Sequence, residues 1–163
     1  MIVLIEGLDG VGKTTVSKLL AEKLSYIYIH ESHSDDNVEK EGRIKEFSDR
    51  LSDGNNYVYD RSTLIDDFVY AFLNKEESSL VKRKEEIIDI LHQSKIFHLE
   101  IDEDVRKKRF EDRGDEFVTN ETVEIARREY EKFYERLSNV EFVKLCNDNE
   151  KNVNELIRRI KND

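Results

Sequence analysis

The stretch "IEGLDGVGKTT", Ile5–Thr15, lies close to the start of the chain and decides the fold. Within it, Gly7–Thr14 fits the pattern G-x-x-x-x-G-K-[ST]. A short apolar run, Ile2–Ile5, precedes the pattern, and an amphipathic run, Thr14–Leu24, follows it. Glycines let such a loop curl tightly, so that its backbone N–H groups and the helix N-terminus form a cradle for phosphate groups. We therefore predict a nucleotide-binding P-loop.

Two side chains of this loop carry most of its chemistry. Lys13 can bridge the β- and γ-phosphates of a nucleotide, and the Thr14 hydroxyl can ligate Mg²⁺. The backbone amides around them would hold the remaining phosphate oxygens. The residues of this stretch that we expect to bind nucleotide are Gly7, Asp9, Gly10, Val11, Gly12, Lys13, Thr14 and Thr15.

Short apolar runs alternate with longer amphipathic runs along the rest of the chain. Further strands are predicted at Tyr26–Ile29, Tyr57–Tyr59, Ile96–Ile101 and Phe142–Leu145. Further helices are predicted at Val38–Leu51, Thr63–Leu73, Leu80–Leu91, Glu103–Arg113, Glu121–Leu137 and Val153–Ile160. This order is typical of an α/β protein with a mainly parallel sheet. We predict a three-layer P-loop NTPase fold, a five-stranded parallel sheet flanked by helices, in a single domain over residues 1–163.

Charged residues follow the second and third predicted strands. In "YVYDRS", Asp60 ends an apolar strand in the Walker-B manner, which would place its carboxylate beside Mg²⁺, and Arg61 follows at once. Arg61 suits the capture of a phosphate group or the steadying of a transferring phosphoryl group. Glu31 follows the second strand and could accept a proton from a hydroxyl group, although it could equally be a solvated loop residue.

The segment "RKKRFEDRGDE", residues 106–116, combines a basic helix with a glycine that ends it. Arg109 and Arg113 are four residues apart and share a helical face. On a short lid they could close over a triphosphate and neutralise developing charge. The alternative is a salt-bridged surface helix, because acidic residues lie nearby. We favour catalytic roles for both arginines.

Composition restricts the partners. The 163-residue chain is 37% apolar and carries a formal net charge of −10, which opposes binding to a nucleic-acid polymer. No apolar run approaches the roughly 18 to 20 residues that a membrane span needs. A single cysteine, Cys146, excludes an intrachain disulfide and suits a reducing compartment. We therefore expect a cytoplasmic protein with a small-molecule nucleotide or nucleoside substrate and no membrane partner.

Four stretches resemble thymidylate kinases: "IVLIEGLDGVGKTTVSKLLAEKL" at the start, "YDRS", the lid-like "RFEDRGDEF" and "VKLCNDNEKNVNELI". The resemblance implies ATP as phosphoryl donor and Mg²⁺ held by Thr14 and Asp60. It also places Asp9 near the acceptor sugar, Arg61 at the acceptor phosphate and Asn147 in a loop that borders adenine. Members of this family often form homodimers, so the resemblance is compatible with a homodimer, although the sequence does not fix the oligomeric state.

Two departures from that family concern the acceptor. Thymidylate kinases usually have Arg-Glu-Pro after the second strand, where this chain has His30, Glu31 and Ser32, and Ser62 replaces the aromatic residue of their Asp-Arg motif. The segment "DRSTLIDDFVYAF" instead resembles deoxynucleoside kinases, whose acid after the second strand acts as a base toward the sugar hydroxyl.

Three functions are compatible with these features. The first choice is ATP-dependent phosphorylation of a (deoxy)nucleoside monophosphate, in particular dTMP to dTDP. The alternative is a deoxynucleoside kinase that phosphorylates the 5′-hydroxyl group. A second alternative is a non-catalytic nucleotide-binding regulatory module, which would keep the P-loop but would need neither Glu31 nor the lid arginines.

Overall fold

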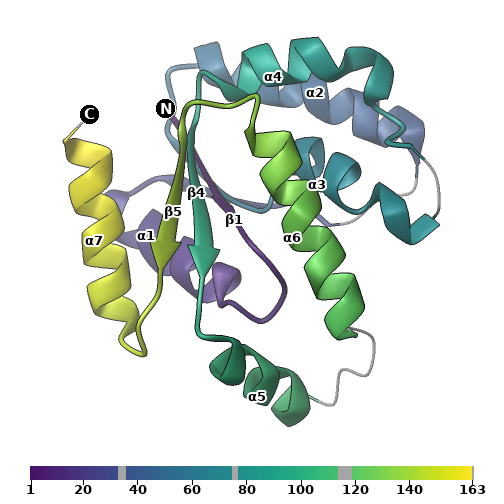
Figure 1. Ribbon diagram of the computed structural model, residues 1–163. Coiled ribbons are helices and arrows are strands. Elements are labelled where there is room, and N and C mark those ends of the chain that lie inside the picture. Colours follow the sequence, from purple (N-terminus) through teal and green to yellow (C-terminus); the bar gives the residue numbers. More distant parts are fainter. Residues whose placement is uncertain (33–35, 75–76, 114–118, 163) are drawn as a thin grey trace.

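The computed structural model describes residues 1–32, 36–74, 77–113 and 119–162. Five parallel strands form one sheet in the order β2-β3-β1-β4-β5 (Figure 1). The strands are β1 (Ile2–Glu6), β2 (Ile27–His30), β3 (Tyr57–Asp60), β4 (Lys95–Glu100) and β5 (Val140–Lys144). This arrangement confirms the predicted P-loop NTPase fold.

Helices cover both faces of the sheet (Figure 1). One face is covered by α1 (Lys13–Leu24) and α7 (Asn149–Lys161). The other is covered by α2 (Asn37–Ser52), α3 (Thr63–Val69), α4 (Lys84–Leu91) and α6 (Asn120–Tyr134). Helix α5 (Glu103–Arg113) lies beyond the carboxyl ends of the strands, beside the loop that joins β1 to α1. In the part of the chain described here, no helix is both long and apolar enough to cross a bilayer.

Strand β1 forms the centre of the core because both of its faces are covered. All five of its residues are buried, and four of them, Ile2 to Ile5, are aliphatic. A continuous apolar run of this kind is typical of a central strand in a parallel sheet. Strand β2 lies at the edge, and its four residues are only partly buried or exposed. The central strand therefore holds the P-loop on a rigid base.

One predicted helix is shorter than expected. The pattern predicted a helix over Thr63–Leu73, whereas α3 ends at Val69 and a 3₁₀-helix follows at Ala71–Asn74. The carboxylate of Asp67 accepts hydrogen bonds from the Ser78 hydroxyl and from the Leu80 backbone N–H group (3.2 Å), which folds the following segment back onto α3. Similarly, the helix expected over Leu80–Leu91 begins as a 3₁₀-helix, Val81–Arg83, before α4.

The register of the sheet brings polar residues together near the carboxyl ends of the strands. His30 of β2 and Ile5 of β1 both lie beside Asp60 of β3, and Glu6 of β1 lies beside His98 of β4. These positions are at the carboxyl ends of the strands, where open α/β sheets bind their ligands.

His98, in strand β4, makes the stability of the protein depend on pH. Its ring is buried, and Nδ1 lies 3.1 Å from the Tyr134 hydroxyl oxygen. Burial, followed by the positive charge of Lys13, lowers the pKa of His98 from 6.5 to about 4. Between pH 6.5 and about pH 4, His98 is protonated in the unfolded chain but stays neutral in the folded protein. The free energy of unfolding should therefore fall as pH falls. The full effect is about 3 kcal/mol, at about 1.4 kcal/mol per pKa unit.

Urea unfolding of the wild type and of His98→Phe between pH 7 and pH 4 tests this prediction. The variant loses the hydrogen bond to Tyr134. Its free energy of unfolding should nevertheless fall less steeply between pH 7 and pH 4 than that of the wild type. Carboxyl groups that titrate in the same range are common to both proteins. Equal slopes for the two proteins would contradict the assignment.

Candidate active site

The P-loop has the backbone conformation that its glycines allow. Gly7 has φ 134°, and a Cβ atom there would lie 2.5 Å from the Leu99 carbonyl oxygen. Gly10 has φ 82°, and a Cβ atom there would lie 2.7 Å from the Phe110 ring. Both positions combine a left-handed backbone with no room for a side chain, so glycine is required. The N-cap of α1 is Gly12, which has no side chain to occupy the helix N-terminus.

Lys13 is folded back onto this loop. Its Nζ donates hydrogen bonds to the carbonyl oxygens of Gly7 (2.6 Å) and Leu8 (2.8 Å), and it lies 3.7 Å from the Asp9 carboxylate. The side chain is 5% exposed. A buried ammonium group held in this way is positioned for a ligand phosphate without a large loss of side-chain entropy on binding.

Asp60 is held by three groups through one of its oxygens. Oδ2 accepts hydrogen bonds from the hydroxyls of Thr14 (2.6 Å) and Tyr28 (3.0 Å), and it lies 3.1 Å from Nδ1 of His30. Oδ1 is buried and has no hydrogen-bond partner among the described residues. An unpaired carboxylate oxygen beside a hydroxyl group is the kind of oxygen ligand that Mg²⁺ prefers. Thr14 and Asp60 therefore fit the predicted metal site.

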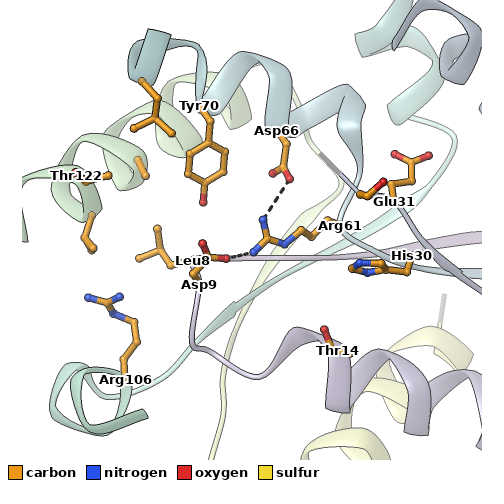
Figure 2. A pocket seen from close by; sticks show the side chains of 14 residues that line it. Leu8, Asp9, Thr14, His30, Glu31, Arg61, Asp66, Tyr70, Arg106 and Thr122 are labelled. Carbon is orange, nitrogen blue, oxygen red and sulfur yellow. Dashed lines mark ion pairs between the residues drawn. The ribbon is translucent and has the colours of Figure 1, made fainter. Parts of the chain in front are cut away.

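Arg61 spans the entrance between the P-loop and α3. Its backbone has φ 71°, an unusual conformation for a non-glycine residue, and its N–H group donates to the Ile5 carbonyl oxygen (3.1 Å). The guanidinium forms an ion pair with Asp9 and lies 3.7 Å from Asp66 (Figure 2). Both carboxylates therefore share the positive charge of this arginine.

Glu31 is held in a defined position at the end of β2. Its Oε2 accepts a hydrogen bond from the Thr63 backbone N–H group (2.7 Å) and lies 3.6 Å from Nη1 of Arg43. Arg43 is itself held by the Ser32 carbonyl oxygen (3.0 Å). Burial raises the pKa of Glu31, although Thr63 and Arg43 act in the opposite direction. A carboxyl group with a raised pKa is a better proton acceptor near neutral pH than an ordinary glutamate.

Of the residues described above, Asp9, Thr14, Glu31 and Arg61 line a chamber of about 610 Å³ (Figure 2). Three carboxyl groups line it, from Asp9, Glu31 and Asp66, together with two guanidinium groups, from Arg61 and Arg106. The remaining wall includes the Tyr70 ring and the side chains of α6. The chamber thus lies between the P-loop, α3 and the pair α5 and α6.

The other predicted site residues lie outside this chamber. Nη1 of Arg109 donates to the carbonyl oxygens of Gly10 (3.1 Å) and Val11 (2.9 Å), so this arginine is bound to the P-loop itself. Thr15 is exposed on α1, and Asn147 is exposed in the loop between β5 and α7. The side chain of Arg113 and the lid segment 114–118 lie outside the described residues.

Sequence reasoning assigned no role to three residues that line the chamber, namely Asp66, Tyr70 and Arg106. Asp66 lies 3.3 Å from the buried Tyr130 hydroxyl group, so α6 helps to position it. Spacing gave no signal for Arg106, because Lys107 and Lys108 of the same helix also have acidic residues four positions away.

The sequence matches a known protein family over residues 3–135, a family described as an AAA domain. The chain belongs to the AAA_18 family. The chain is similar in sequence to the SPbeta prophage-derived uncharacterized protein YorR of Bacillus subtilis (strain 168). The two sequences are 32% identical over 127 residues, which is 76% of this chain and 75% of YorR.

Several solved structures share the fold of this AAA_18 protein. YorR in complex with phosphorylated GDP superposes with a TM-score of 0.75 at 22% identity, over 99% of this chain and 96% of YorR. Deoxyadenosine kinase from M. mycoides, with dCMP and dCDP, has a TM-score of 0.65 at 17% identity over 100% of both chains. Thymidylate kinase from Candida albicans has a TM-score of 0.63 at 15% identity, over 99% of this chain and 91% of that one. The AAA_18 chain therefore has the P-loop kinase fold.

Proposed function

We propose that the protein transfers the γ-phosphoryl group of ATP to the 5′-hydroxyl group of a deoxynucleoside. The observation that carries this proposal is the charge of the chamber. Three carboxyl groups face two guanidinium groups there, and the guanidinium of Arg61 is already shared by Asp9 and Asp66. A neutral sugar hydroxyl fits such a chamber more readily than a second phosphate group, which like charges would repel.

Glu31 supplies the base that this reaction needs. The 5′-oxygen of the acceptor forms a new bond to the γ-phosphorus as the bond to the ADP oxygen breaks, and the hydroxyl proton passes to the Glu31 carboxylate. The side chain of Glu31 is only 8% exposed and its pKa is raised, and both properties suit that transfer. Arg61 lies at the neighbouring strand end, where it can offset charge on the transferring group.

The donor half of the site consists of the P-loop, Lys13 and the residues that bind Mg²⁺. Backbone amides and the Lys13 ammonium group would hold the β- and γ-phosphates, and Thr14 with Asp60 would hold Mg²⁺. When bound, Mg²⁺ neutralises phosphate charge. We place Arg109 and Arg113 on the donor side, where α5 contacts the P-loop, and Asn147 beside the adenine ring.

A second candidate function is the phosphorylation of dTMP to dTDP. It is favoured by Arg61, whose guanidinium lies beside Asp9 of the P-loop in the chamber lining and could contact the acceptor phosphate. The spelling EGLDG-x-GKTT in the P-loop also favours it. Phosphorylation of a deoxynucleoside remains the proposal because three carboxyl groups and only two guanidinium groups line the chamber in the described part of the chain.

A panel of acceptors separates these functions. The protein is incubated with ATP and Mg²⁺ and with each of the four deoxynucleosides or their 5′-monophosphates, and ADP formation is followed. We expect turnover with at least one deoxynucleoside and at least about tenfold less with its monophosphate, a difference of about 1.4 kcal/mol. Turnover with monophosphates alone would favour the second candidate, and none with any acceptor would favour the regulatory module.

A further inference from the structure

Arg106 is a buried cation with one unused hydrogen-bond donor. Arg106 is 3% exposed, and its Nε and Nη2 donate hydrogen bonds to the two carboxylate oxygens of Glu103 (3.1 and 2.6 Å). Nη1 is buried and has no partner within the described part of the chain. Buried guanidinium groups usually have all their donors satisfied, so the open donor points to a missing ligand atom.

The surroundings of Arg106 fix its direction. Glu103 also accepts a hydrogen bond from Nη2 of Arg127 on α6 (2.6 Å), which holds the carboxylate between two helices. The guanidinium of Arg106 lies 5.2 Å from the centre of the Phe110 ring, and both side chains pack against Gly10 of the P-loop. The donor is therefore preorganised, so little side-chain entropy would be lost when it binds a ligand.

Arg106 lies on the opposite side of the chamber from the reacting groups. In Figure 2, Arg106 and Thr122 border one end, Glu31, His30 and Thr14 border the other, and Asp9 with Arg61 lies between them. A nucleoside whose 5′-hydroxyl group reaches Glu31 would direct its base away from that end. Arg106 then borders the end of the chamber that holds the base, where a carbonyl oxygen of the base would accept a hydrogen bond from Nη1.

We propose that Arg106 determines acceptor specificity by donating a hydrogen bond from Nη1 to a carbonyl oxygen of the nucleobase. Bases that carry a carbonyl group, such as hypoxanthine and thymine, satisfy this donor, whereas adenine offers no carbonyl oxygen. This inference rests on the proposed function, since it takes the chamber to be the acceptor site.

The test is the ratio of kcat/KM for the better of thymidine and deoxyinosine to kcat/KM for deoxyadenosine. Wild-type protein should favour the carbonyl-bearing nucleoside by about 10- to 100-fold, the range expected for one hydrogen bond to a charged group. Arg106→Met should lower that ratio to about one by raising KM for the carbonyl-bearing nucleoside, with KM for ATP unchanged. Arg128→Met is the matched control, because it removes an exposed arginine of α6 that is not part of the chamber lining, and it should keep the wild-type ratio.

A folded Arg106→Met protein with the wild-type ratio would overturn the inference, as would an effect confined to KM for ATP. If Arg106→Met does not fold, Arg106→Lys serves instead, since lysine keeps a charge near Glu103 but lacks the second donor arm. Failure of the proposed function can be told apart from failure of this inference. If only monophosphates react, the same ratio of kcat/KM is measured with the corresponding monophosphates. If nothing reacts, calorimetric affinities of the three nucleosides replace kcat/KM, and equal affinities, or no binding at all, would overturn it.

Discussion

Replacement of Glu31 by glutamine is expected to lower kcat with a deoxynucleoside by about 10²- to 10⁴-fold, the usual contribution of a general base. Glutamine keeps the size of the side chain and can still accept the hydrogen bond from the Thr63 backbone N–H group, so the loop should stay in place. It cannot take up the proton of the acceptor hydroxyl. Steady-state kinetics with saturating ATP and nucleoside measures this loss directly.

The matched control for Glu31→Gln is Glu39→Gln. Glu39 is a second carboxylate that contacts Arg43, but it lies on the exposed side of α2 and outside the chamber lining. Its replacement should leave kcat within about twofold, as expected for a surface ion pair. Similar losses in both variants would mean that the carboxylates act through Arg43 and not through the reacting hydroxyl.

The pH dependence of kcat/KM gives the Glu31 prediction a second readout. The base must be deprotonated, so activity should rise with pH through the pKa of Glu31, which burial raises above that of an exposed glutamate. The ascending limb should be missing from the residual activity of Glu31→Gln. A limb that persists in the variant would assign the titration to another group.

Replacement of Lys13 by alanine is expected to lower kcat by at least about 100-fold, the scale of losing one preorganised donor to a transition state. The ammonium group lies on the P-loop, where it donates to the carbonyl oxygens of Gly7 and Leu8, and we expect the variant to remain folded. Undiminished turnover in Lys13→Ala would contradict a phosphotransfer role for the P-loop.

Lys23→Ala is the control for Lys13→Ala because it removes a lysine from the same helix. Lys23 lies at the far end of α1 and pairs with Glu150 of α7. Its replacement should leave kcat unchanged, and urea unfolding should show that both variants remain folded. A loss of activity in both would indicate a general effect of charge.

The fold was predictable from sequence because its signals are local. The P-loop glycines directly follow the strand residues Ile2 to Ile5 in the sequence, and their pattern alone predicts a buried strand, a tight loop and a helix. The end of α3 was not predictable, since it depends on Asp67 meeting Ser78 and Leu80 across a turn. Tertiary contacts of that kind override local helix propensity.

The site was predictable only in part, for the same reason. Asp60 and Thr14 were expected to meet because the P-loop follows β1 and Asp60 ends the neighbouring strand β3, and they lie in hydrogen-bond contact. Arg106 could not be distinguished from the other basic residues of its helix by spacing alone. Its burial comes from Phe110 and Glu103, whose positions depend on how α5 packs against Gly10 and α6.

The central claim is that the γ-phosphoryl group of ATP ends on a sugar hydroxyl group of the acceptor. ³¹P NMR of the products formed from ATP, Mg²⁺ and the best deoxynucleoside tests it most directly. The account predicts a phosphomonoester signal, coupled to the 5′-methylene protons, that grows in step with ADP. Inorganic phosphate as the sole partner of ADP would contradict it, as would a new diphosphate signal that appears only when a monophosphate is supplied.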